Sequence, residues 1–241
     1  LIRTNNKRES RIMKKLNILL SVLLSAFLFT SVQAGSIGLG ISGNVGTISA
    51  EGTETEASSG SETENSVRTA TAGNNFAFGT AFLEYNFGDS ERFTIGVDYV
   101  PGTADVNNKN LSRTDTASTD SANNDQSGTY TANAEISDHI TYYAEVKVTE
   151  AFYVKAGMAT VDIKTKDTTT SSGTVGNYPD KTLDAFTYGL GVKGDLGGSL
   201  FYKVEGTYVD YDTFSATSTT SNKVTANLDG YNGKLAIGMK F

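Results

Sequence analysis

The sequence predicts an all-β fold: a transmembrane antiparallel up-and-down β-barrel of eight strands, with a lipid-facing exterior and a polar, charged lumen. Apolar residues recur at every second position in eight segments, short and long connections between these segments alternate, and charged residues fall on the opposite face. The final segment shows the alternation most clearly. Its apolar positions are Tyr231, Leu235, Ile237, Met239 and Phe241.

The residues before the first predicted strand have the features of a secretory leader. Residues 1–12 are polar and basic and are expected to be upstream sequence without a structural role, because Met13 is a plausible start. Two lysines follow Met13, residues 16–32 are apolar, and small residues stand before the expected cleavage site. Because the apolar stretch is short for a membrane span, a signal peptide over 13–34 is favoured over a permanent transmembrane helix. The barrel domain is then expected over 35–241.

The composition of residues 35–241 also favours a barrel. No apolar run there approaches the ~20 residues of a membrane helix. Tryptophan is absent, so the aromatic girdles at the two membrane interfaces would consist of Tyr and Phe. These residues include 14 basic and 26 acidic side chains, a formal charge of −12, which argues against a nucleic-acid partner. The chain has no cysteine, which excludes a disulfide and a lipoprotein anchor.

Each predicted strand is long enough to cross a bilayer at a tilt. On the fourth of them, Ile136 and Ile140 share the outward parity with Val148. The eight strands are expected at residues 36–49, 76–87, 92–100, 129–148, 152–163, 183–194, 199–211 and 229–241.

The connections between these strands alternate strictly between short and long. This asymmetry is typical of an outer-membrane barrel with periplasmic turns and extracellular loops, and an even strand number puts both mature termini on the periplasmic side. The short connections are 88–91, 149–151 and 195–199, and the long polar ones are 50–73, 101–128, 164–182 and 212–228.

A soluble lipocalin-type barrel also has eight antiparallel strands, but its apolar face points inward around a ligand. Here ten charged residues lie opposite the apolar face, and so many charges do not line a dry ligand pocket. The short turn after Val148 would pair Val148 with Phe152 and place Glu145 across from Lys155, which predicts an ion pair in the lumen. The ten residues are Glu84, Asp98, Glu145, Lys147, Lys155, Lys193, Lys203, Glu205, Lys234 and Lys240.

Three features together resemble the small OmpA/OmpX-like eight-stranded outer-membrane barrels: the signal-like residues 13–34, the segment Leu-Glu-Tyr-Asn-Phe-Gly-Asp at 83–89, and the terminal strand 231–241. The resemblance implies a Gram-negative outer membrane, with membrane lipid and lipopolysaccharide as surroundings. It also implies that Phe241 and the apolar face of the last strand form part of the signal that the barrel assembly machinery reads. The architecture is shared by proteins of many functions.

An eight-stranded lumen is just wide enough to be filled by side chains, so the charges are expected to form a plug. The favoured function is a structural or surface-interaction role for a monomer, with any partner contacts on the extracellular loops. The alternative is a small passive porin-like channel, and an outer-membrane lipid-modifying enzyme is the least favoured.

Catalytic, metal and cofactor sites are not expected. His139, the one histidine, has inward parity beside Ser137 and Thr141, whereas a lipase-like triad would need a lipid-facing groove. Residues 189–194 fit GxGxxG by letters only, because no helix follows them. The long loops carry clustered carboxylates whose spacing matches no defined calcium loop; these are Glu51, Glu54, Glu56, Glu62, Glu64, Asp105, Asp115, Asp120 and Asp125.

Overall fold

The structure is a computed structural model that describes residues 35–241 except 56–66, 107–110, 116–127, 170–176 and 220. The predicted upstream sequence and signal peptide, residues 1–34, lie outside the described residues. Within the described part, no helix combines the length and the apolar character needed to span a membrane.

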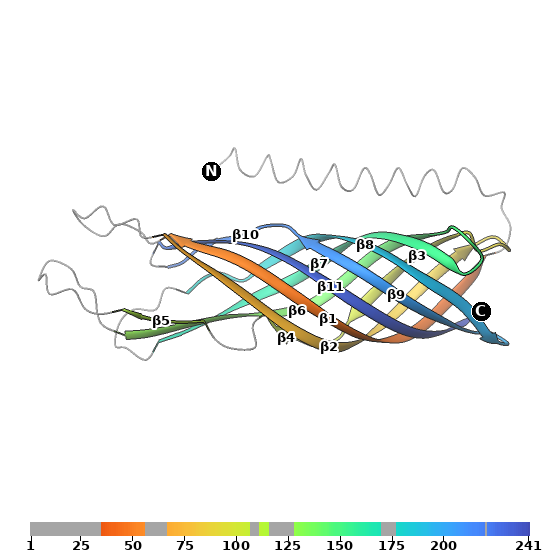
Figure 1. The fold of residues 1–241 in the computed structure, drawn as a ribbon, viewed down its shortest axis with the longest axis horizontal. Coiled ribbons are helices and arrows are strands. Elements are labelled where there is room, and N and C mark those ends of the chain that lie inside the picture. The colour runs from red at the N-terminus through yellow and green to blue at the C-terminus, as the bar shows by residue number, and fades with distance from the viewer. Residues whose placement is uncertain (1–34, 56–66, 107–110, 116–127, 170–176, 220) are drawn as a thin grey trace, which may run out of the picture.

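Eight long strands form a single closed ring, drawn in Figure 1 as an elongated, twisted cylinder. Each strand is antiparallel to both neighbours, and the last pairs back with the first. The predicted eight-stranded antiparallel barrel is therefore confirmed. The strands are β1 (Ser36–Thr55), β2 (Val67–Phe87), β3 (Phe93–Val100), β6 (Gly128–Lys147), β7 (Phe152–Thr169), β8 (Lys181–Gly197), β9 (Leu200–Tyr211) and β11 (Lys223–Lys240).

Three shorter strands extend the ring locally. β4 (Ala104–Asp105) and β5 (Leu111–Asp115) pair with β6, and β10 (Phe214–Thr217) pairs with β11. Ring closure is completed by Phe241, whose backbone N–H donates to Ile37 over 2.9 Å while the N–H of Ile37 donates to the carbonyl of Phe241 over 3.1 Å. A closed ladder leaves no long unpaired edge, which a lipid environment would penalise.

Side-chain burial alternates along the strands as predicted. On β1, the side chains of Ile41 and Val45 are 67% and 65% exposed, whereas the intervening Ser42 and Asn44 are buried. Because a strand alternates its side chains between two faces, the apolar face of the ring points outward and the polar face inward. This inside-out arrangement is that of a transmembrane barrel.

Aromatic side chains on the outer face gather in two groups, one beside the short turns and one further along the strands. Rings within a group lie close together: Tyr85 and Phe87 are 4.8 Å apart by centroid, and Tyr208 and Tyr231 are 4.9 Å apart. Two such girdles mark the two membrane interfaces of a barrel. The turn-side girdle contains Tyr85, Phe87, Phe93, Phe152, Tyr202 and Phe241, and the loop-side girdle contains Tyr99, Tyr142, Phe186, Tyr188, Tyr208 and Tyr231.

The short turns gather at the end of the cylinder where the C-terminus lies (Figure 1). They join Phe87 to Phe93, Lys147 to Phe152 and Gly197 to Leu200, as predicted. Gly88 in the first turn and Gly198 in the third have φ of 67° and 62°, a conformation that glycine adopts without a steric penalty.

The strands extend well beyond their predicted ends on the loop side. β1 and β2 stay paired as far as Thr55 opposite Val67, and β7 continues to Thr169, inside segments predicted to be loops. Those predicted boundaries were wrong because they followed apolar alternation. Backbone pairing needs no apolar face once a strand has left the membrane, since cross-strand polar pairs such as Thr53 and Thr69 are equally compatible with the ladder.

One irregularity reverses the facing of β6. Between Ser137 and Ile140 the strand has one more residue than the facing stretch of β7, and Asp138 there has a φ of 51°. Such a β-bulge puts the residues before it on the opposite faces from those that an unbroken two-residue alternation would give them. Ile136, predicted to face lipid, therefore pairs with the buried Ile163 and packs inside the barrel, so that prediction was wrong.

The interior has two halves of different character. The half near the short turns holds the charged residues, as predicted. The loop-side half holds an apolar cluster that the sequence analysis did not anticipate, and we call it the upper cluster. Its buried members are Ile48, Val161, Ile163, Leu183, Phe214, Ala216 and Leu228.

Candidate functional site

The charged residues of the lower interior come from seven of the eight strands. Each occupies an inward position, and the ring of short turns brings these positions to similar depths in the barrel. The residues are less than 10% exposed, so they are removed from water. They are Glu84 on β2, Asp98 on β3, Glu145 on β6, Lys155 on β7, Lys193 on β8, Lys203 and Glu205 on β9, and Lys234 on β11.

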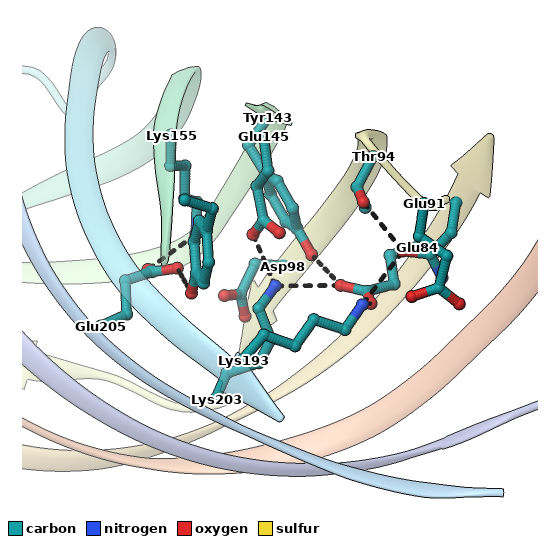
Figure 2. Close-up of polar contacts among 12 residues, drawn as sticks. Glu84, Glu91, Thr94, Asp98, Tyr143, Glu145, Lys155, Lys193, Lys203 and Glu205 are labelled. Carbon is teal, nitrogen blue, oxygen red and sulfur yellow. Dashed lines mark hydrogen bonds and ion pairs between the residues drawn. The ribbon is translucent and has the colours of Figure 1, made fainter. Parts of the chain in front are cut away.

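Glu84 is the centre of this network (Figure 2). Its carboxylate accepts a hydrogen bond from the ammonium of Lys193 over 2.6 Å and another from Lys203 over 3.0 Å. Lys203 also donates to Glu145 over 2.5 Å. The hydroxyl of Tyr143 donates to Glu84 over 3.4 Å. One carboxylate thus ties together strands on opposite sides of the lumen.

A second group surrounds Glu205. Lys155 donates to its Oε1 over 2.8 Å, and the hydroxyl of Thr207 donates to the same oxygen over 2.9 Å. The hydroxyl of Tyr153 donates to Oε2 over 3.0 Å. Every oxygen of this buried carboxylate is therefore paired, as burial of a charge requires.

Lys234 and Asp98 form a third group, a single ion pair across the lumen between β11 and β3. Aromatic rings fill the space around the ammonium groups: the Nζ of Lys155 lies 4.1 Å from the ring centroid of Tyr143, and that of Lys193 lies 4.5 Å from Phe201. Contacts between an ammonium group and an aromatic face stabilise desolvated cations. The network contains four carboxylates and four ammonium groups, so its formal charges balance.

The predicted partnership of Glu145 with Lys155 is only half right. The register does place Glu145 opposite Lys155, and both are buried in the lumen. Among the described residues, however, Lys155 forms its ion pair with Glu205 and Glu145 forms its ion pair with Lys203. The prediction used only the β6–β7 hairpin, whereas a narrow lumen lets long side chains reach strands that are not neighbours.

Glu91 closes the turn end of the lumen. Its Oε2 accepts from Lys240 over 2.9 Å and from Lys147 over 3.4 Å, and its Oε1 accepts from the hydroxyl of Ser36 over 3.1 Å. Lys240 also pairs with Asp195 over 3.0 Å. One carboxylate from the β2–β3 turn thus joins β1, β6 and β11. Sequence reasoning included Lys147 and Lys240 but missed Glu91, because Glu91 lies in a turn and has no strand parity.

The pKa of Glu91 yields a testable pH dependence. Partial burial alone would raise this pKa, but the hydrogen bond from Lys240 and the charges of Lys193, Lys240 and Lys147 outweigh it and lower the pKa below 4.5. A lowered folded-state pKa stabilises the protein above the ordinary pKa, and this contribution is lost as pH falls through the folded value.

We therefore expect Glu91→Gln to lower the unfolding free energy at pH 7 by under about 1 kcal/mol, because the group is partly exposed. The difference from wild type should shrink steadily as the pH falls from 5 toward 3. Urea unfolding in detergent at several pH values measures it. A difference that stays constant over this range would show that the carboxylate charge of Glu91 is not what stabilises the turn end.

The remaining predicted positions lie away from this network. The apolar side chains of the last strand, from Tyr231 to Phe241, are exposed on the outer face. The ring of His139 lies inside, with its centroid 6.3 Å from that of Tyr211. Residues 189–194 are part of β8. No group of three or more His, Asp or Glu suited to a metal ion occurs among the residues that the structure describes; Glu56, Glu62, Glu64, Asp120 and Asp125 lie outside them.

Sequence reasoning also missed the upper cluster, although a signal for it exists. Leu183 and Leu228 have the same parity as Lys193 and Lys234 further down their strands, and Ile48 has the parity of the buried Ser42 and Asn44, so all three point into the lumen. Along the inward face, the residues change from charged near the turns to apolar near the loops. The sequence analysis considered apolar residues on the outward face alone and so did not detect this change.

No protein-family model matches the chain, and no curated protein sequence matches it. Among solved structures, it is similar to the attachment invasion locus protein Ail of Yersinia pestis, with 13% identity over 84% of this chain and 99% of that one and a TM-score of 0.34. It is also similar to the outer membrane protein OprG of Pseudomonas aeruginosa, with 12% identity over 87% and 97% of the two chains and a TM-score of 0.39. The translocator domain of the Neisseria meningitidis autotransporter NalP gives 13% identity, coverage of 95% and 96%, and a TM-score of 0.38.

Likenesses this weak carry no conclusion about function, so the assignment depends on the molecule itself. The ring is closed, its strands are antiparallel and even in number, its outer face is apolar between two aromatic girdles, and its inner face buries paired charges. Only such a closed barrel, or a helix, satisfies its backbone within a bilayer. The chain is therefore an outer-membrane β-barrel protein of eight strands whose lumen holds a buried network of paired charges.

Proposed function

We propose that this protein is a plugged structural barrel of the outer membrane that does not conduct ions. The observation that carries the proposal is the neutral network around Glu84 and Glu205, whose ammonium and carboxylate groups are paired and almost without exposure. An ion entering the lumen would have to displace these pairs, and an uncompensated buried charge is costly. The upper cluster adds an apolar barrier on the loop side.

Planar-bilayer recording of the refolded residues 35–241 tests this proposal. We expect no conductance steps above the background of the bilayer at salt concentrations up to 1 M. A stable conductance that increases with salt concentration would instead support the alternative, a small passive channel. Refolding is verified independently by the shift in gel mobility on heating, so an absence of conductance cannot be attributed to unfolded protein.

The long connections are proposed to face the cell exterior, with both termini of the barrel at the periplasmic side. The support is the unequal length of the connections at the two ends, which is typical of outer-membrane barrels. Loops carry function on rigid scaffolds, so contacts with lipopolysaccharide or with a surface partner belong at this end. The protein is proposed to act as a monomer.

We also propose that the protein is not an enzyme. His139, the one histidine of the chain, lies on the inward face beside Tyr211 and in the interior rather than at a lipid-facing groove. A lipid-modifying triad needs its base where an acyl chain or headgroup can reach it.

The outer face of the last strand is proposed to act in assembly. Phe241 is 73% exposed, and its backbone alone makes the closing hydrogen bonds with Ile37. We expect Phe241→Ala to lower the amount of folded barrel in cells several-fold while leaving refolding yield in detergent nearly unchanged. Comparing heat-modifiable protein from envelopes with refolded protein measures this. An equal loss in cells and in detergent would mean that the Phe241 side chain only packs against lipid and is not part of an assembly signal. Ile41→Ala, on the outer face of β1, controls for the general loss of lipid contact.

A further inference from the structure

A cavity of about 1050 Å³ lies in the middle of the barrel. Its lining comes from β2, β1, β11, β9 and β8, which are consecutive strands spanning more than half of the ring. A groove on the convex outside of a cylinder cannot contact that many strands, so the cavity is inside. Each strand contributes a short stretch centred on an inward residue. These central residues are Phe76, Gly46, Asn232, Thr207 and Gly189.

The cavity, which we call the chamber, separates the charged network from the upper cluster. Along β11 the inward positions run from Lys234 through Asn232 to Leu228, and along β9 they run from Glu205 to Thr207 and Val209. The chamber thus has a polar floor and an apolar roof. Its volume is comparable to that of pockets that hold small molecules.

Polar atoms without partners point to an occupant. Within the described residues, the Oδ1 of Asn232 and the Oγ1 of Thr187 are shielded from solvent and have no hydrogen-bond partner. Asn232 lines the chamber, and Thr187 is the next inward residue after Gly189 on β8. The amide nitrogen of Asn232 is already engaged with Asn44 over 3.2 Å. Buried polar atoms are rarely left unpaired, so the Oδ1 of Asn232, which lines the chamber, is suited to accept a hydrogen bond from an occupant.

No ionised side chain is among the residues that line the chamber. The neighbouring charges are already paired: Lys234 binds Asp98, and Glu205 binds Lys155. A charged ligand would enter uncompensated, which burial penalises. The inward residues of β1 and β8 at this depth are Gly46 and Gly189, and the ring of Phe76 lies against Gly46. The lining favours a neutral molecule with a substantial apolar part.

The outward neighbours of the lining are also informative. Tyr188, Tyr208 and Tyr231 flank Gly189, Thr207 and Asn232 and belong to the loop-side girdle. The chamber therefore lies at the depth of one membrane interface, where small amphiphilic molecules concentrate.

We propose that the chamber binds a small uncharged molecule that combines an apolar body, aromatic or aliphatic, with a hydroxyl or amide that donates a hydrogen bond to Asn232. The apolar body lies against Phe76 and the upper cluster, and the donor satisfies the amide oxygen of Asn232. This assigns a ligand site to a lumen whose lower half is structural, and it holds whether or not the barrel contacts a surface partner.

Two matched probes test the site: 2-naphthol, which has the donor, and 2-methoxynaphthalene, which has the same rings without it. The refolded barrel in lipid nanodiscs is titrated with each probe, and the backbone amides of Gly46 and Gly189 and the side-chain amide of Asn232 are followed by ¹⁵N NMR. Saturable shifts at these positions, with 2-naphthol binding about tenfold more tightly, are expected, since one hydrogen bond contributes about 1.4 kcal/mol.

Asn232→Ala should reduce the affinity for 2-naphthol to that for 2-methoxynaphthalene and leave the latter unchanged. Asn227→Ala is the matched control, because Asn227 lies on the same strand as Asn232 but is exposed and does not line the chamber, so it should change neither affinity. Asn232→Leu keeps the approximate side-chain shape without the amide and should have the same effect as Asn232→Ala, so it provides a second variant if the alanine protein does not fold.

Three results would overturn the proposal. One is the absence of shifts at Gly46 and Gly189, which would mean that the chamber holds only water. Another is shifts confined to outward residues that do not line the chamber, such as Ile41 and Ile237, which would mean adsorption to the lipid face. The third is equal affinity for the two probes in the wild type, which would remove the role of Asn232.

Discussion

Glu84→Gln should lower the free energy of unfolding by about 3–5 kcal/mol, the cost typical of removing one partner from a buried ion pair. Glu84 is almost fully buried and holds the ammonium groups of Lys193 and Lys203. Glutamine keeps the shape but removes the charge, so two cations lose part of their compensation in a lumen shielded from water. Urea unfolding of the refolded barrel in detergent, followed by circular dichroism, measures the change.

Glu135→Gln is the matched control for Glu84→Gln. Glu135 pairs with Lys166 over 2.7 Å, but the lysine side chain is 48% exposed, so we expect a change of under about 1 kcal/mol. Equal, small effects at the two positions would contradict the dry plug and imply that water screens the charges around Glu84. That outcome would also weaken the proposal of a closed, non-conducting barrel.

A double-mutant cycle on Lys155 and Glu205 should show a coupling of about 2–3 kcal/mol, at the upper end for residues in direct contact. Lys155→Met leaves the Glu205 carboxylate with only hydroxyl donors among its hydrogen bonds, and Glu205→Gln removes its charge. The double variant should recover part of the loss, because no unpaired charge then remains at this place. Unfolding free energies of the four proteins give the coupling directly.

The cycle on Glu145 and Lys155 serves as the comparison. These residues are opposite each other in the register, but their ion pairs are made with Lys203 and Glu205. We expect a weaker coupling here than between Lys155 and Glu205. The reverse order would mean that the hairpin neighbours, and not the strands across the lumen, determine the ion pairs.

The fold could be predicted from the sequence because a barrel wall imposes a strict two-residue period. Leu235, Ile237 and Met239 face lipid while Lys234 and Ala236 are buried, and this contrast is visible in the letters alone. Loop-side boundaries were harder to predict. Past the girdle at Tyr231 the outer face meets water, so the ladder of β11 continues to Lys223 without any apolar signal.

The sequence predicted which charged residues point into the interior, but not which of them form ion pairs with each other. Parity determines that Lys155 points inward; it does not determine that its ammonium reaches Glu205 rather than Glu145. That choice depends on how side chains from seven strands share one narrow space, which requires three-dimensional packing. The chamber was missed for the same reason, since it is bounded by residues from five strands.

The extra residue at Asp138 has an evolutionary consequence. It changes which residues of β6 face inward. On the loop side of the bulge, the even-numbered residues Ala134 and Ile136 pack in the interior, and Glu135 pairs with Lys166 at the rim. Loss of that one codon would exchange the inward and outward faces of β6 on the loop side. Glu135 would then enter the apolar upper lumen, and Ile136 would face outward. Single-codon insertions and deletions near the girdle therefore offer barrels of this kind a route to a new lumen chemistry while the eight-stranded wall is retained.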